Sequence, residues 1–246
     1  LSRTTIGWAG LIFGVYAINF LWAPLIDRLH LPLISKKIGH RKSWIILMQL
    51  IIFISLLLWS LLDPTKNLWL VIAVGLGIAI SSATQDITID ALRIEQIGEN
   101  EKNLLSAGAA ISVVGWWTGY KIGGLISLVS ADILQKQGVE NYWQISFVIL
   151  SGIIVLCSLC LLLIPEKNSE RKINFQKASD QKLIDKIGVS NFFTKGFAWL
   201  YSTVINPLLS FFKKNTFKVA LAILGFIFLF KIGEAFLGRM SIIFYK

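Results

Sequence analysis

Long apolar stretches recur along this chain, and they limit what it can fold into more than any other feature does. A helix of roughly 20 predominantly apolar residues crosses the hydrocarbon layer of a membrane. Six runs reach about that length, at residues 6–26, 44–62, 68–89, 104–129, 143–164 and 219–237. With 55% hydrophobic and 15% charged residues, the chain has too little polar material to cover a water-facing globule. We therefore predict an all-α, polytopic membrane protein with about six transmembrane helices.

Basic residues are concentrated in alternate loops, and this asymmetry predicts the orientation. Loops 27–43 and 93–103 and the segment 164–218 hold seventeen Lys and Arg residues, whereas loops 63–67 and 130–142 hold two. Loops rich in Lys and Arg face the cytoplasm. We expect 27–43, 93–103 and 165–217 to be cytoplasmic. The net charge of +10 then reflects topology and attraction to anionic lipid, and we expect no nucleic-acid partner.

Two carboxylates, Asp86 and Asp90, lie one helical turn apart at the inner end of the third apolar run. A carboxylate at bilayer depth costs several kcal/mol unless it faces a wet cavity, takes up a proton or pairs with a cation. Asp86 and Asp90, with Gln85 beside Asp86, are candidates for a substrate or proton site. The alternatives are a packing role and a gate clasp, in which the acids pair with Arg93, Arg28, Arg41 or Lys42 when the inner side is closed.

Two further groups of polar residues are candidates for a transport site. Lys231 and Glu234 lie near the middle of the last run, three residues apart, so they can form an ion pair within the helix or bind substrate or proton. Trp117, Thr118 and Lys121 share a helix face whose aromatic, hydroxyl and ammonium groups suit a charged sugar-peptide. Alternatively, Lys121 extends to the outer interface. A ridge of small residues, Gly115, Gly119 and Gly123, is expected to pack against a neighbouring helix.

Catalytic and metal-binding patterns are absent from the sequence. Cys157 and Cys160 lie in an apolar run without polar neighbours and are interpreted as packing residues, and His30 and His40 lie in a loop. We expect no metal, no cofactor and no enzymatic activity.

Five motifs occur in order along the chain: FLWAPLIDR at 20–28, GHRKSW at 39–44, ATQDIxxDA at 83–91, GAAISVxG at 108–115 and FKIGEAF at 230–236. Together they resemble the AmpG family of muropeptide permeases, a branch of the major facilitator superfamily. The resemblance also covers the superfamily's loop motif, and it implies gate positions at Asp27, Arg28, Gly39, Arg41, Lys42 and Arg93. It implies proton-coupled import of anhydromuropeptides, which are anionic sugar-peptides, across the bacterial inner membrane for peptidoglycan recycling.

Other functions remain open alternatives. The stretch around Asp86 and Asp90 is also similar to a neighbouring branch that carries acetyl-CoA, so a carrier for another anionic solute is one alternative. A truncated remnant that does not transport is another.

The resemblance also implies a division of the chain into three parts. Residues 1–164 are expected to form an N-terminal transmembrane half without its first helix, because run 6–26 enters from outside. Residues 165–217 are a cytoplasmic central loop, and 218–246 are the first helix of a truncated second half. Within the loop, apolar residues interleaved with polar ones from 192 to 212 end in Lys213 and Lys214. This pattern is typical of an interfacial amphipathic helix, here broken at Pro207, and the alternative is a plain linker.

Overall fold

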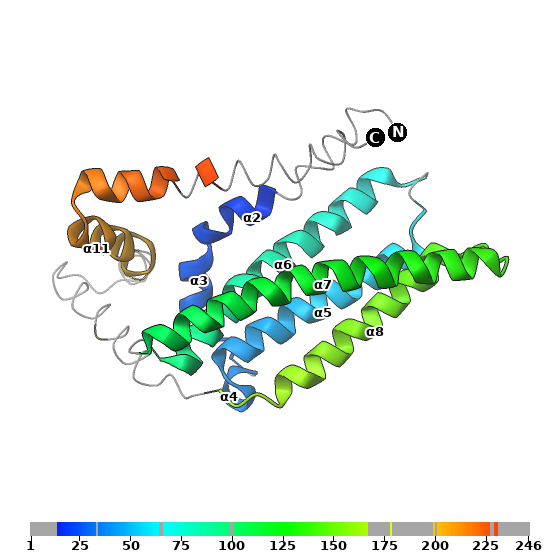
Figure 1. Ribbon diagram of the computed structural model, residues 1–246, viewed down its shortest axis with the longest axis horizontal. Helices are drawn as coiled ribbons and strands as arrows, with labels where there is room; N and C mark the ends of the chain where they lie inside the picture. Colours follow the sequence, from blue (N-terminus) through cyan, green and yellow to red (C-terminus); the bar gives the residue numbers. More distant parts are fainter. Residues whose placement is uncertain are drawn as a thin grey trace. The chain divides into compact units, whose positions relative to one another are not determined.

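A computed structural model describes residues 14–32, 34–63, 66–98, 101–166, 178, 199, 201–226, 229 and 230 of the chain (Figure 1). The described residues form helices and contain no strand, which confirms the all-α prediction. They belong to two compact units: Leu1–Asn19 with His30–Asn168, and Phe20–Leu29 with Ser169–Lys246. The two units are described separately below.

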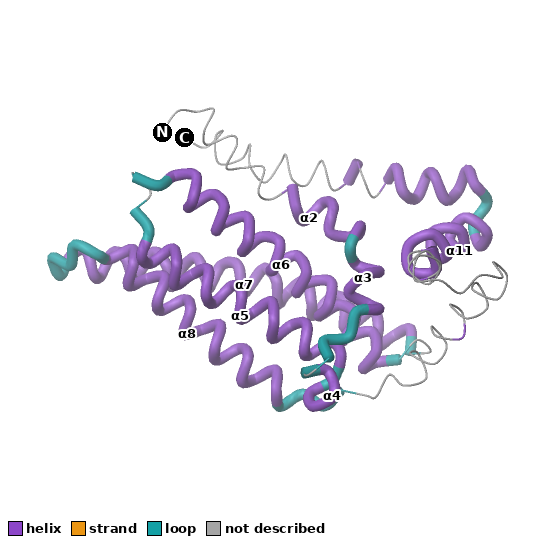
Figure 2. Tube along the Cα trace, turned by 180° about the vertical axis from the view of Figure 1, so that it is seen from behind, coloured by secondary structure: helices purple, strands orange, loops and turns teal. Residues whose placement is uncertain are grey.

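Four long helices make up most of the first unit, and in both views they lie side by side (Figures 1 and 2). They are α5 (His40–Leu61), α6 (Leu68–Ile97), α7 (Lys102–Lys136) and α8 (Tyr142–Leu162), joined to the short α2 (Val15–Ile18) and α4 (Ser35–Ile38). Helix α5 packs against both α6 and α8, and α7 packs mainly against α8. Among the described helices, α5, α6 and α8 are long and apolar enough to cross a membrane.

Small and hydroxyl-bearing residues allow α6 to approach α5 closely. Ala83, Thr84 and Thr88 are buried on one face of α6. The two threonine hydroxyls donate 2.8 Å hydrogen bonds to carbonyls one turn earlier in the same helix, so their burial leaves no polar group unpaired. On the other side of α5, the Ser158 hydroxyl of α8 donates a 2.7 Å hydrogen bond to Gln49 Oε1.

The helices of this unit extend beyond the apolar runs that predicted them. Run 68–89 lies in α6, which continues to Ile97, and run 104–129 lies in α7, which continues to Lys136. Hydropathy marks where a helix leaves the apolar layer, whereas the backbone hydrogen bonds continue into the polar region. Helix α6 ends at Gly98, whose φ of 95° is a conformation that favours glycine.

The described part of run 6–26 is not one continuous helix. Helix α2 is followed by a 3₁₀ turn, η2 (Asn19–Leu21), and a new helix, α3 (Ala23–Arg28), begins after Trp22. Pro24 lies in the first turn of α3. Proline lacks the N–H group of a helix interior but is well suited to a first turn, so the helix restarts there.

The second unit combines α3 with elements from the later part of the chain. A π-helical turn, η3 (Tyr201–Ile205), packs against α3 and leads into α11 (Asn206–Lys214), and an apolar helix follows at Phe217–Phe226. Pro207 lies in the first turn of α11, so it begins this helix and does not break it. Lys231 and Glu234 lie outside the described residues.

Gly39 precedes α5 in a conformation, φ 102° and ψ 162°, that is essentially restricted to glycine. A methyl group at this position would also collide with the carboxylate of Glu166. We therefore expect Gly39→Ala to lower the free energy of unfolding by about 1–3 kcal/mol. Gly152→Ala is the control, because Gly152 is in the middle of α8 with open space around it, and it should be neutral or stabilising. Thermal unfolding in detergent measures both, and an equal effect of the two changes would contradict the strain at Gly39.

Candidate functional site

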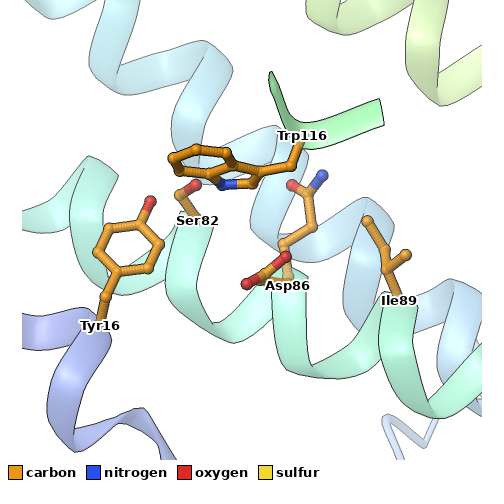
Figure 3. A pocket seen from close by; sticks show the side chains of 6 residues that line it. Tyr16, Ser82, Asp86, Ile89 and Trp116 are labelled. Carbon is orange, nitrogen blue, oxygen red and sulfur yellow. The ribbon is translucent and has the colours of Figure 1, made fainter. Parts of the chain in front are cut away.

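A small pocket lies beside α6 in the first unit, lined by side chains from three helices (Figure 3). Ser82, Gln85, Asp86 and Ile89 come from α6, Tyr16 comes from α2, and Trp116 comes from α7. The pocket has a volume of about 100 Å³ and is partly open at the surface of the described structure. In Figure 3 the Trp116 indole extends across toward Ser82, and Tyr16 approaches Ser82 from the other side. The pocket thus offers a carboxylate, an amide, hydroxyl groups and an aromatic face within one small space.

The packing of α6 explains why Asp86 lines this pocket. Ser81, Thr84, Thr88 and Leu92 recur at helical spacing and are buried. Asp86 lies on the opposite face of the helix and is exposed in the described part of the structure. The same phase places Ser82, one turn earlier, beside Asp86. Ser82 and Asp86 therefore both line the pocket.

Gln85 contributes an acceptor to the pocket wall. Within the described part of the chain, its Oε1 atom is buried without a hydrogen-bond partner. A buried polar group left unpaired costs about 1–3 kcal/mol. An N–H or O–H group of a bound solute would remove that cost, which makes Gln85 a candidate binding residue.

A second cluster of charged residues lies at the ends of α5, α6 and α8, where the predicted topology puts the cytoplasmic side. Arg41, at the start of α5, is only 2% exposed, and its Nη2 atom lies 2.8 Å from Oε1 of Glu95 near the end of α6. The Arg41 Nε atom also donates to Glu95 at 3.3 Å. Burying a guanidinium is costly unless it is paired and hydrogen-bonded, so Glu95 is required for Arg41 to lie there.

The residues that follow α8 complete this cluster. The Glu166 carboxylate accepts hydrogen bonds from the backbone N–H groups of Arg41 and Lys42, at 2.8 and 3.0 Å, and so caps α5. The Lys42 Nζ atom donates to the Ile164 carbonyl at 2.8 Å, and the Gln96 side chain donates to the Pro165 carbonyl. The first turn of α5 is therefore bonded to the ends of both α6 and α8. We call Arg41, Lys42, Glu95 and Glu166 the inner cluster.

The structure differs from the predicted clasp in its partners. Asp90 pairs with Arg93 at 3.1 Å, which confirms the ion pair expected from their spacing, and Arg93 also donates to the Gly108 carbonyl at 3.1 Å. Arg41, however, pairs with Glu95 and not with Asp86 or Asp90. The reason is that α6 continues two turns past its apolar run and so brings Glu95 to the first turn of α5.

The α7 candidates are arranged differently from the prediction. Trp117, Thr118 and Lys121 are exposed and do not line the pocket, whereas the neighbouring Trp116 does. Trp116 stacks on Tyr120 with ring centroids 5.9 Å apart. The glycine ridge contacts no neighbouring helix among the described residues, since the positions above Gly115, Gly119 and Gly123 are open. Which face of α7 lines the pocket depends on the helices that it packs against, and the sequence of α7 alone does not predict that face.

The remaining candidate residues lie in the second unit or outside the described residues. Asp27 and Arg28 lie in α3 of the second unit, where Arg28 Nη1 donates to the Trp199 carbonyl at 3.2 Å. Lys231 and Glu234 stay predictions. Among the described His, Cys, Asp and Glu residues, no group of three or more could hold a metal ion.

The sequence reasoning missed four residues of these two sites: Tyr16, Trp116, Glu95 and Glu166. For Glu95 a signal existed, because this acid is six residues past the apolar run and continues its helical pattern. Glu166 is 125 residues from Arg41 along the chain, and helical periodicity contains no information about such a contact.

Comparison with known proteins agrees with this architecture. Residues 1–244 match the Major Facilitator Superfamily, and the chain belongs to that family of membrane proteins. Together with the apolar helices α5, α6 and α8, this membership defines the chain as a membrane protein.

Its relatives include AmpG-type proteins, which confirms the resemblance found in the motifs. The chain is 31% identical over 245 residues to the "Anhydromuropeptide permease" of Escherichia coli K12, covering 99% of this chain and 42% of that protein. It is 30% identical over 230 residues to the "Putative transporter AmpG 4" of Rickettsia felis, covering 94% of this chain and 48% of that protein. The chain thus spans about half the length of these relatives.

Removal of the Glu95 charge tests the energetics of the inner cluster. Glu95→Gln removes the charged partner that the buried Arg41 guanidinium contacts through Nε and Nη2, so we expect the free energy of unfolding to fall by about 3 kcal/mol. Asp132→Asn is the matched control, because Asp132 pairs with Lys136 at 2.7 Å on the surface of α7 with both side chains more than half exposed. Loss of that exposed pair should cost only about 0.5 kcal/mol. Denaturant unfolding in detergent measures the difference, and equal costs would show that the Arg41–Glu95 pair is not stabilising.

Proposed function

We propose that this chain is part of a secondary transporter that imports anhydromuropeptides across the bacterial inner membrane, driven by protons. The observation that carries this proposal is the Asp86 pocket: a carboxylate in the apolar α6 helix, beside an aromatic ring and an amide, in a chain of the Major Facilitator Superfamily. Intramembrane carboxylates of this kind mark substrate and proton pathways.

The pocket chemistry suits one part of a sugar-peptide. The face of an indole such as that of Trp116 packs against the C–H groups of a sugar ring, and the Gln85 and Ser82 side chains can hydrogen-bond to sugar hydroxyls or amides. A volume of about 100 Å³ is smaller than the roughly 300–1,000 Å³ of complete ligand pockets. The pocket is therefore proposed as one subsite, and the rest of the solute lies against other groups.

The charges divide into two proposed roles. Asp86 carries the coupled proton, whereas the inner cluster and the Asp90–Arg93 pair stabilise the state in which the inner side is closed. Opening toward the cytoplasm requires these contacts to separate, and each separation exposes a charge to water. We assign the peptide carboxylate of the solute to a lysine, either Lys231, which is three residues before Glu234 in the sequence, or Lys121.

Transport in proteoliposomes that contain the protein tests the role of Asp86. An asparagine resembles a protonated aspartate, so Asp86→Asn should abolish accumulation driven by a pH gradient while exchange of labelled for unlabelled anhydromuropeptide continues. Asp132→Asn should leave both modes unchanged, since Asp132 is an exposed acid outside the pocket and the inner cluster.

Two results would contradict the proposal. If accumulation persists in Asp86→Asn, Asp86 does not carry the coupled proton. If exchange and accumulation are lost equally, Asp86 has a role in binding or gating. Unlabelled acetyl-CoA is included as a competitor, and competition by acetyl-CoA with none by anhydromuropeptide would overturn the proposed substrate.

A further inference from the structure

Helix α11 in the second unit has one apolar face and one basic face. Leu209 and Phe212 are three residues apart and lie on the same side, in line with Ile205 at the end of η3. Leu209 is 41% exposed and Ile205 is 38% exposed, so no described part of the chain covers this side completely. Ser210 and Lys214 lie on the other side, Lys213 lies at the edge of the apolar face one turn after Leu209, and all three are exposed.

The charge around α11 has a single sign. Between Lys186 and Gly233 the sequence contains no Asp or Glu. Lys213 and Lys214 occupy the last turn of α11, and Lys218 lies in the first turn of the next helix. Lysines in a cytoplasmic segment attract anionic lipid, each contributing a roughly fivefold preference for the membrane surface.

Structural connections on both sides place α11 between two apolar segments. On one side, η3 packs against α3, and Arg28 of α3 donates to the Trp199 carbonyl at 3.2 Å. Helix α3 ends the first apolar run, at its predicted inner end. On the other side, the apolar helix Phe217–Phe226 starts after Thr216, and Phe217 stacks on Phe212 with ring centroids 5.6 Å apart. A helix bounded in this way by two apolar segments stays close to the headgroups.

We propose that α11 docks on the anionic phospholipid surface of the inner leaflet. Ile205, Leu209 and Phe212 insert between the acyl chains near the headgroups, and Lys213, Lys214 and Lys218 donate hydrogen bonds to lipid phosphates. The docked helix anchors the segment that is bonded to Arg28. This inference does not depend on the transported solute.

Lipid quenching of a site-specific fluorophore on the full chain tests the docking. Cys157 and Cys160 are replaced by serine, and a fluorophore is attached to Leu209→Cys on the apolar face or to Ser210→Cys on the polar face. The chain is reconstituted in vesicles of phosphatidylcholine, with or without phosphatidylglycerol, that contain nitroxide-labelled lipid as the quencher. Phosphatidylglycerol should increase quenching at position 209 and leave position 210 accessible to a water-soluble quencher. Lys213→Gln with Lys214→Gln should lower the docked-to-undocked ratio roughly 25-fold.

A second pair of lysines provides the matched control. Lys66 and Lys136 are 79% and 74% exposed, and both lie in the loops predicted to face outside. Lys66→Gln with Lys136→Gln removes the same charge from the chain, so quenching at position 209 should be unchanged. Quenching that does not depend on phosphatidylglycerol would overturn the proposal. An absence of quenching by the labelled lipid in all vesicles would also overturn it, because a protein surface would then cover the apolar face.

Discussion

The buried guanidinium of Arg41 is the interaction on which the inner end of the first unit depends. A charge that is 2% exposed must be compensated by its neighbours, and Glu95 supplies the counter-charge from α6. Glu166 binds the backbone amides of the same turn from the segment after α8. The end of α6 and the segment after α8 thus converge on the first turn of α5, through an ion pair and charge-assisted hydrogen bonds. Such contacts can act as a switch, because water or a competing charge replaces them when the helices move apart.

Helix α6 connects this cluster to the pocket. One face, with Thr84 and Thr88, packs closely on α5, and the opposite face presents Ser82 and Asp86 to the pocket. The same helix continues to Asp90 and Glu95, whose carboxylates pair with Arg93 and Arg41. A movement of α6 relative to α2, α5 and α7 would therefore change the pocket and the inner cluster together. In the proposed transport cycle, this shared helix is the physical basis for coupling between Asp86 and closure of the inner side.

Local sequence patterns predicted much of the fold but only part of the site. The apolar runs identified α5, α6, α7 and α8, and the spacing of Asp90 and Arg93 predicted their ion pair. Helices α6 and α7 continue past their apolar runs because hydropathy reports the apolar layer and not the last backbone hydrogen bond. The partner of Arg41 and the identity of the pocket tryptophan depend on how separate helices pack. Periodicity within one helix gives no register between helices, so Glu166 and Trp116 became visible only in three dimensions.

The most direct test of solute entry into the Asp86 pocket is protection of Ser82 from a thiol reagent. Ser82→Cys is introduced with Cys157 and Cys160 replaced by serine, and the labelling rate is measured in proteoliposomes with and without anhydromuropeptide. Asp132→Cys, at an exposed position near the end of α7, is the control. We predict that the solute slows labelling at position 82 and leaves position 132 unchanged. Equal labelling of Ser82→Cys with and without the solute would contradict a binding role for this pocket.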